Sequence, residues 1–275
     1  MVNGAGGRRG CPSPSRISEA KPLRWRVLVD RPLPGALNMA RDHGLALALA
    51  PGTAVLRLYQ WDRPTVSFGR NEPAVRLYSR DEAVARGVGF VRRPTGGRAV
   101  LHHKELTYGV IFPTGALGGL KEVYGKINRG LLAGIRSLGV PAQLASPDSP
   151  SLPPDAGPCF REPSQGEVTA LGRKLIGSAQ VRIGRSILQH GSIILDGDQG
   201  ILATLRGEAA VPASATLRSV LGRMPGLDSV RDAIRDGLAG TLGGAWEEGD
   251  YTKDEKMAAS ELEAHYEDEE WTWRL

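Results

Sequence analysis

The feature that most constrains the fold is the order in which two hydrophobic periodicities follow each other along the chain. Helical repeats prevail in the last third, over residues 228–242 and 252–266. Because strand-like segments come first and do not alternate regularly with helices, we expect an α+β fold rather than repeated βα units. The strand-like segments, in which apolar and polar residues alternate, are 24–30, 54–61, 64–69, 87–113 and 167–196.

Two further helices are expected among the strands, over residues 37–50 and 120–140. In the last third, Thr252 and Glu255 form a capping-box pattern at the start of the final long helix. The helix over 120–140 has the clearest pattern, because its apolar residues recur at steps of three and four and form one stripe. The stripe consists of Leu120, Val123, Ile127, Leu131, Ile135 and Leu138.

The chain divides into a short tail and one long folded part. Residues 1–22 lack periodicity and are rich in Gly, Pro, Ser and Arg, so we expect a disordered N-terminal tail. The chain is 41% hydrophobic and 24% charged, and we expect residues 23–275 to fold as a single domain with a helical C-terminal part. Residues 141–163 contain seven prolines. This segment exceeds the ~15 residues beyond which a loop is usually functional or disordered.

Charge and cysteine content say more about the cellular compartment of the protein than about its function. The net charge is +5 and the pI is about 9.4, which fits either a solvated basic surface or docking to an acidic macromolecule. No apolar run is long enough to cross a bilayer, and the first residues lack the apolar core of a secretory signal. Cys11 and Cys159 are far apart and no zinc-type spacing occurs. We therefore expect a cytoplasmic protein without a disulfide framework or a metal site.

Three segments carry residues suited to chemistry, and each also has an ordinary structural interpretation. In RRPTGGRAVLHHKELTY, residues 92–108, paired glycines would let the backbone approach a ligand, and nearby arginines would supply positive charge. The ordinary interpretation of such a glycine pair is a hairpin turn. In GRKLIGSAQVR, residues 172–182, Lys174 is either a solvent-facing strand residue or an ammonium held beside developing negative charge.

The third segment is PPDAGPCFREPS, which contains Cys159. A free cysteine is usually a small buried hydrophobe, but the prolines and charged residues around this one are poor core material. A neighbouring cation, either Lys174 or an arginine, would promote ionisation of the thiol. Cys159 is therefore also a candidate nucleophile.

Taken together, these segments resemble a known family. The ordered motifs RRPTGGRAVLH…ELTY, CF…PS…E, GRKLIGSAQ and LQHGSIILD are similar to those of the biotin/lipoate protein ligase superfamily. Within it, they are most similar to the cysteine-dependent octanoyltransferases of lipoate biosynthesis. The resemblance runs from about residue 37 to residue 196. It implies a biotin/lipoate protein ligase-like catalytic domain with a mixed β-sheet and packed helices, consistent with the α+β expectation.

The resemblance implies an octanoyl-[acyl carrier protein]:protein N-octanoyltransferase. Such enzymes move octanoyl from the phosphopantetheine thiol of acyl carrier protein to a lysine of a lipoyl-carrying protein. The acceptor would be a protein such as the glycine cleavage H protein or a 2-oxoacid dehydrogenase subunit. Neither ATP nor another cofactor is implied, because the octanoyl group arrives as a thioester on its carrier. Nucleic acids and membranes are not implied as partners.

The resemblance also assigns residues. Cys159 falls where the family has its acyl-thioester nucleophile, and Lys174 falls where it has the lysine that promotes ionisation of that cysteine. The residues expected to bind the acyl substrate are Arg93, Gly96, Gly97, Arg98, His102, Gly177 and His190.

Three residues depart from the family pattern. His103, Gly109 and Gly166 stand where an aspartate, a serine and an aromatic residue are usual. None of them removes the nucleophile or its cation. We expect them to affect the fine shape of the acyl pocket, and hence acyl-chain selectivity.

Three alternatives stay open from the sequence. An ATP-dependent lipoate-protein ligase would use Lys174 on an acyl-adenylate and would not need the cysteine. An octanoyl amidotransferase acting between lipoyl-carrying proteins would also use a cysteine. The positive net charge leaves a more distant alternative, a non-catalytic nucleic-acid-binding protein, although no recognition helix or RNP-like aromatic set is present.

Overall fold

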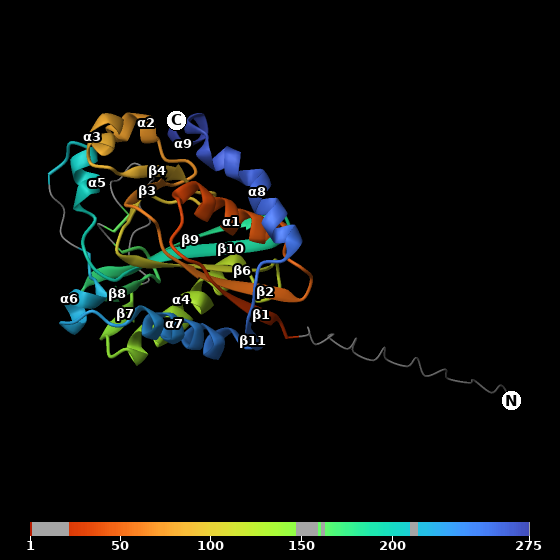
Figure 1. Ribbon diagram of the computed structural model, residues 1–275. Helices are drawn as coiled ribbons and strands as arrows, with labels where there is room; N and C mark the ends of the chain where they lie inside the picture. The colour runs from red at the N-terminus through yellow and green to blue at the C-terminus, as the bar shows by residue number, and fades with distance from the viewer. Residues whose placement is uncertain (2–21, 147–158, 161–162, 210–213, 275) are drawn as a thin grey trace.

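The computed structural model describes residue 1 and residues 22–146, 159–160, 163–209 and 214–274 (Figure 1). The disordered tail expected over residues 1–22 lies almost entirely outside the described residues. Most of the proline-rich segment lies outside them too, but Cys159 and Phe160 are described.

The central element is a mixed sheet of eight strands. They are β1 (Arg24–Val29), β2 (Thr53–Tyr59), β6 (Glu105–Pro113), β7 (Ala142–Leu144), β8 (Val168–Ala170), β9 (Arg173–Ile183), β10 (Ser186–Ile194) and β11 (Ala245–Glu248). Their order across the sheet is β11-β1-β2-β6-β10-β9-β8-β7. β1 pairs in parallel with β11 and β2, whereas the other neighbours are antiparallel.

A smaller sheet contains β3 (Thr65–Phe68), β4 (Gly89–Arg92) and β5 (Val100–His102). Its order is β4-β3-β5, with β4 parallel and β5 antiparallel to β3. The glycine pair of residues 96–97 therefore connects two strands that do not pair with each other. The hairpin interpretation of this segment is wrong, because the chain crosses β3 between β4 and β5.

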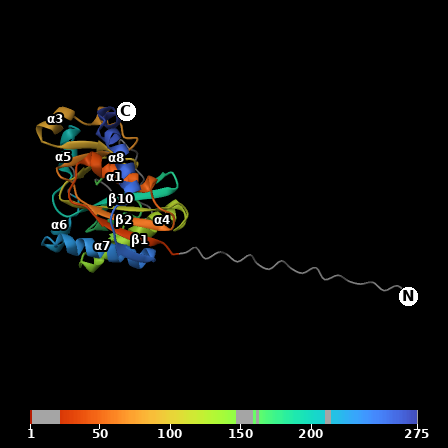
Figure 2. The ribbon, with the colours of Figure 1, turned by 45° about the vertical axis from the view of Figure 1, so that its right-hand side comes forward.

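Helices cover both faces of the central sheet (Figure 1). Figure 1 and Figure 2 show α1 and α8 above it and α4 and α7 below it. The long helices are α1 (Gly35–Leu47), α4 (Leu120–Ser137), α7 (Leu227–Leu242) and α8 (Lys253–Glu267). The short ones are α2 (Ala74–Leu77), α3 (Arg80–Ala85), α5 (Gly200–Leu205), α6 (Leu217–Leu221) and α9 (Glu269–Trp273). The α+β expectation is confirmed, as is the capping box, in which Thr252 and Glu255 each bond to the other's backbone.

Alternation along β2 decides what each face of the sheet contacts. Leu56 and Leu58 belong to the main core, which also contains the stripe of α4, whereas Val55 packs in a second cluster with Leu45 of α1. Within the stripe, Val123, Ile127, Leu131 and Ile135 are fully buried. Leu120 is not part of this core, since it opens the first turn of α4 and is 49% exposed.

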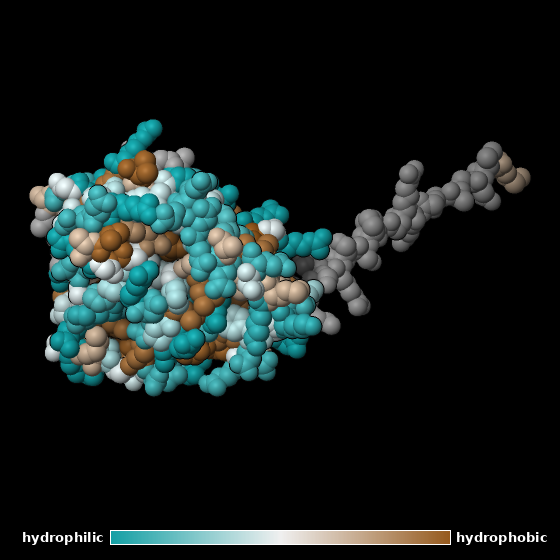
Figure 3. Space-filling view, turned by 45° about the horizontal axis from the view of Figure 1, so that its top comes forward, coloured by the Kyte–Doolittle hydropathy of each residue, from teal (hydrophilic) through white to brown (hydrophobic). Residues whose placement is uncertain are grey.

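No helix in the part of the chain that the structure describes is both long and apolar enough to cross a bilayer. The face in Figure 3 is largely hydrophilic, with hydrophobic residues in small separate areas. Single exposed apolar residues of this kind are ordinary on a protein surface.

Glycines let α4 and α7 approach closely. A Cβ atom on Gly134 of α4 would lie 2.3 Å from the backbone carbonyl oxygen of Ala233 in α7. A Cβ atom on Gly237 would lie equally close, 2.3 Å, to the carbonyl oxygen of Gly130. Since these contacts are to backbone, which cannot rotate aside, any side chain here would push the helices apart.

Gly134→Ala is therefore expected to lower the free energy of unfolding by about 1–3 kcal/mol, as overpacking does. Gly240→Ala is the control, because Gly240 is exposed on α7 and a Cβ there would meet nothing within 4 Å. That change is expected to be neutral or stabilising by up to about 1 kcal/mol, from helix propensity. Urea unfolding followed by circular dichroism measures both values. Equal effects of the two changes would contradict the close helix contact.

Candidate active site

Cys159 is held by its backbone and by its neighbour. Its N–H donates to the carbonyl oxygen of Ala99 at 3.0 Å. The adjacent Phe160 is buried in a small cluster with Val100 and Ile194, against which Cys159 also packs. The thiol is half-buried and forms no disulfide. Its position is therefore fixed between β5 and the end of β10.

Lys174 of β9 meets this cysteine. Its Nζ lies 3.1 Å from Sγ of Cys159 and donates to the carbonyl oxygen of the same residue at 3.0 Å. Its side chain is only 1% exposed. The solvent-facing interpretation of Lys174 is therefore wrong, and the alternative of a held ammonium fits its surroundings.

Glu167 balances the charge of this lysine, and no role for it was inferred from the sequence. Its Oε2 lies 2.8 Å from Nζ of Lys174 and accepts the N–H of Ser164 at 2.7 Å. Burial alone would lower the pKa of Lys174, but the Cys159 sulfur and the Glu167 carboxylate raise it above its ordinary value. The ammonium thus keeps its proton at neutral pH. The available signal was the glutamate in the CF…PS…E motif.

A cavity lined in part by Cys159 extends across the central sheet. Four of its lining residues come from neighbouring strands in register: Tyr59 of β2, Thr107 of β6, Ser192 of β10 and Gly177 of β9. We call these four the cross-strand row. Adjacent strands are about 4.8 Å apart, so the row spans about 14 Å. The opposite wall includes Met39 of α1 and Val100 of β5.

The structure brings the predicted site residues together. Six of them line this one cavity: Cys159, Arg93, Gly97, His102, Gly177 and His190. The other three adjoin it. Lys174 contacts the thiol, Gly96 accepts a bond from Arg93, and a guanidinium nitrogen of Arg98 donates to the carbonyl oxygen of Cys159 at 3.4 Å.

Arg93 shapes the wall of the cavity. Its five N–H donors all meet protein oxygens, on Ser67, Thr95, Gly96 and Arg98. It thereby holds the loop between β4 and β5 in place. Gly97 has a φ of +92°, and a Cβ atom there would lie 2.9 Å from the Arg93 guanidinium. Only glycine fits this position without strain.

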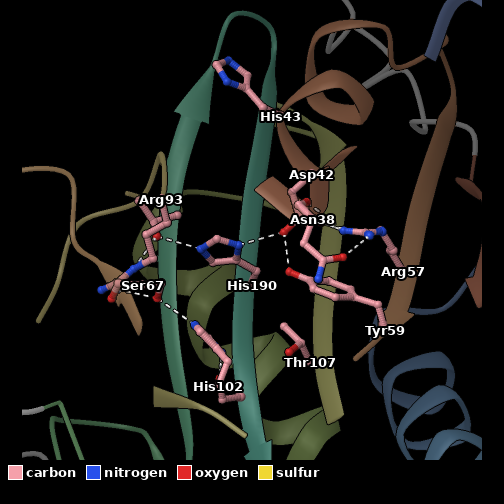
Figure 4. A network of polar contacts seen from close by, with 12 residues as sticks. Asn38, Asp42, His43, Arg57, Tyr59, Ser67, Arg93, His102, Thr107 and His190 are labelled. Atoms are coloured by element: carbon pink, nitrogen blue, oxygen red, sulfur yellow. Dashed lines mark hydrogen bonds and ion pairs between the residues drawn. The ribbon is translucent and has the colours of Figure 1, made fainter. Parts of the chain in front are cut away.

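His190 sits in a chain of buried hydrogen bonds (Figure 4). Its Nδ1 lies 2.9 Å from Oδ2 of Asp42, and its Nε2 lies 2.7 Å from the hydroxyl of Thr95. Asp42 also pairs with Arg57 at 2.7 Å and accepts the Tyr59 hydroxyl at 2.8 Å. Burial raises the pKa of Asp42, but Arg57 and His190 together more than offset this and hold it below its ordinary value.

The protonation state of His190 follows from this setting. Burial lowers the pKa of His190 despite the neighbouring carboxylate. The ring is therefore neutral, with Nδ1–H donating to Asp42 and Nε2 accepting from Thr95. Sequence reasoning missed Asp42 and Arg57. Arg57 is the one charged residue of the segment 54–61, which was the available signal, whereas Asp42 stands between Arg41 and His43.

His102 forms a second group of contacts, which Ser67 and Arg93 join to that of His190 (Figure 4). Its Nδ1 lies 2.8 Å from Oε1 of Glu105, and its Nε2 lies 2.7 Å from the hydroxyl of Ser67. The ring of Trp61 stacks on the imidazole of His102, with the two ring centroids 3.9 Å apart. Oε1 of Glu105 also accepts the hydroxyl of Thr107, at 2.6 Å. These contacts fix the imidazole in the cavity wall.

The three departures from the family pattern lie away from the cavity wall. His103 is exposed, and Gly166 occupies a turn with a φ of +76°. A Cβ atom on Gly109 would lie 3.2 Å from Oδ1 of Asp42, so a serine there would adjoin the network of His190. None of the three is among the residues that line the cavity. Their effect on chain selectivity stays a prediction.

Comparison with known proteins identifies the family. Residues 34–239 match the family model of the lipoyl protein ligase A/B catalytic domain. The chain is 39% identical over 271 residues to "Octanoyltransferase LipM" of Kyrpidia tusciae, covering 91% of this chain and 98% of that protein. It is 41% identical to the protein of the same name from Symbiobacterium thermophilum, with the same coverage of 91% and 98%.

Solved structures share this fold. A lipoate-protein ligase A bound with ATP superposes with a TM-score of 0.77 at 23% identity, covering 91% of this chain and 99% of that one. A bi-partite lipoate protein ligase from Thermoplasma acidophilum superposes with a TM-score of 0.72 at 21% identity, covering 91% of this chain and 96% of that one. At these identities the likeness shows the fold alone. The chain therefore belongs to the lipoyl protein ligase A/B catalytic family and, like its curated octanoyltransferase relatives, is an acyltransferase of lipoate biosynthesis.

Proposed function

We propose that this enzyme transfers octanoyl from acyl carrier protein to a lysine of a lipoyl-carrying protein, through a thioester on Cys159. The acceptor would be a protein such as the glycine cleavage H protein or a 2-oxoacid dehydrogenase subunit. The observation that carries the proposal is the contact of 3.1 Å between Nζ of Lys174 and Sγ of Cys159, at a cavity suited to an acyl chain.

The first half-reaction uses that contact. The Lys174 ammonium neutralises a Cys159 thiolate, which attacks the carbonyl carbon of the carrier thioester. The carbon–sulfur bond to the carrier breaks, and the phosphopantetheine thiol leaves. Because one thioester replaces another, the exchange is nearly thermoneutral and needs no ATP. The octanoyl chain then lies in the cavity, where each buried methylene contributes about 0.8 kcal/mol.

The second half-reaction returns the cysteine to its starting state. The amine of the acceptor lysine attacks the octanoyl-enzyme and forms an amide, which is more stable than a thioester. Cys159 leaves as a thiolate beside the same ammonium. An ATP-dependent ligase would need no such cysteine, and an amidotransferase would differ in taking octanoyl from another lipoyl-carrying protein.

Mixing the native protein with octanoyl-acyl carrier protein is expected to add the mass of one octanoyl group, measured on the intact protein. Cys159→Ser is expected to gain none, because a serine hydroxyl stays protonated beside Lys174. Peptide mapping should place the group on Cys159. A serine variant that transferred octanoyl at the native rate would contradict the thioester.

Donor competition separates the alternatives. Native protein is incubated with a lipoyl domain and one of three donors: octanoyl-acyl carrier protein, an octanoylated H protein, or free octanoate with ATP. We expect the fastest acceptor modification with the first donor. Faster modification with octanoate and ATP would favour a ligase, and faster modification with octanoylated H protein would favour an amidotransferase.

Glu167→Gln is expected to move the basic limb of the acylation pH profile to lower pH. Glu167 raises the pKa of Lys174, so without it the ammonium loses its proton, and the thiolate its counter-charge, at a lower pH. Stopped-flow acylation by octanoyl-acyl carrier protein measures the profile. Glu122→Gln is the control, since Glu122 pairs with Lys126 on the exposed side of α4. An unchanged basic limb in Glu167→Gln would argue against this coupling.

The net charge of +5 suits steering of acidic protein partners. Raising the ionic strength from about 0.1 M to about 1 M shortens the Debye length from about 10 Å to about 3 Å. Acylation by octanoyl-acyl carrier protein is therefore expected to slow, whereas acylation by octanoyl-pantetheine should change little. The ratio of the two kcat/KM values measures the effect, and a ratio independent of salt would exclude steering.

A further inference from the structure

The second half-reaction of the proposed function leaves a proton without an acceptor. When the lysine amine attacks the octanoyl-enzyme, its nitrogen must lose a proton for the amide to form. Lys174 is poorly suited to take it. Its Nζ already faces three acceptors, the carbonyl oxygen and Sγ of Cys159 and Oε2 of Glu167 at 2.8 Å, so it points no lone pair at the incoming amine. A different base has to serve this step.

The described residues that line the cavity include two imidazoles, His190 and His102. Each donates or accepts through both ring nitrogens, and each faces one buried carboxylate. The two carboxylates differ in their other partners. Asp42, beside His190, already pairs with the buried guanidinium of Arg57 at 2.7 Å. Protonating His190 would place a second cation beside the Asp42 carboxylate, whose negative charge Arg57 already neutralises.

Glu105, beside His102, lacks such a permanent cation. Among the described residues, its ion-pair partner is His102, and its other bonds come from the hydroxyls of Thr107 and Ser192. Its second oxygen, Oε2, is buried without a hydrogen-bond partner. The side chain is 1% exposed, so water screens this charge poorly. A proton on His102 would complete the ion pair.

The remaining nitrogen of His102 leads into the cavity. Nε2 lies 2.7 Å from the hydroxyl of Ser67, which lines the same cavity as Cys159. Arg93 donates to the Ser67 oxygen at 3.1 Å, so the serine proton is free to point at Nε2. The distances from Ser67 to His102 and from His102 to Glu105 fall in the range of about 2.6–3.2 Å that proton-transfer groups need.

We propose that His102, oriented by Glu105, is the general base that accepts the proton of the acceptor lysine, relayed by the Ser67 hydroxyl. The nitrogen–carbon bond forms and the carbon–sulfur bond to Cys159 breaks, with its electron pair remaining on sulfur beside Lys174. The amine proton passes to the Ser67 oxygen as the Ser67 proton passes to Nε2 of His102. The imidazolium then releases its proton to water.

The test separates the two half-reactions. His102→Gln is first acylated with octanoyl-acyl carrier protein and then mixed with a lipoyl domain. The ratio of the rate of transfer to the lysine over the rate of acylation is expected to fall by about 10²–10⁴-fold, as loss of a general base does. His103→Gln, a change of the same kind at the exposed neighbouring residue, is expected to keep native rates in both steps.

Hydroxylamine distinguishes a base from a structural residue. It attacks thioesters as a neutral nucleophile at pH 7, so it does not depend on the missing base to the same extent. Octanoyl-His102→Gln is expected to react with hydroxylamine at nearly the native rate while its transfer to lysine stays slow. Glu105→Gln should show the same selective loss of transfer to lysine. It replaces His102→Gln in this test if that variant is poorly folded.

The possible results distinguish failure of the proposed role of His102 from failure of the proposed function. Native transfer rates in both variants, or equal losses with lysine and with hydroxylamine, would overturn the role of His102 and leave the proposed function intact. A native protein that takes no octanoyl group on Cys159 would overturn the proposed function, and this inference with it.

Discussion

The site depends on one buried positive charge. An ammonium as enclosed as that of Lys174 is costly to bury unless oppositely charged groups surround it. Glu167 supplies a permanent partner at 2.8 Å, and the Cys159 sulfur supplies one that exists only when it is ionised. The ammonium thus has a charged partner whether or not the thiol is ionised. This links the fold of β8 and β9 directly to the reactivity of a residue on a separate loop.

The cavity lies between the two sheets, and its two walls are held in place by different interactions. On one side, the cross-strand row is fixed by the pairing of four strands in the central sheet. On the other, the loop after β4 is held by the guanidinium of Arg93 and by the Thr95–His190–Asp42 chain. Asp42 belongs to α1 and is anchored by Arg57 of β2. One continuous network therefore joins helix, sheet and loop around the position of the acyl group.

Local patterns predicted the elements well and the polar contacts less well. The stripe from Val123 to Ile135 and the capping box at Thr252 depend on residues close in sequence, so both were recognisable. The resemblance selected the residues that line the cavity, but the burial of Lys174 depends on Glu167 and Cys159, which lie on other segments. The edge strand β11 escaped notice because it is short, exposed and ends in two glutamates. The hairpin expected at residues 96–97 failed because β3, which separates its flanking strands, is distant in sequence.

The cross-strand row has a consequence for how such an enzyme diversifies. A chain that lies across strands meets a different strand about every 4.8 Å, whereas one that lies along a strand meets successive residues of the same segment. Tyr59, Thr107 and Ser192 thus each line the cavity from a strand of their own. Mutation can therefore reshape the cavity one strand at a time, provided that the bonds of Thr107 and Ser192 to Glu105, and of Tyr59 to Asp42, are kept.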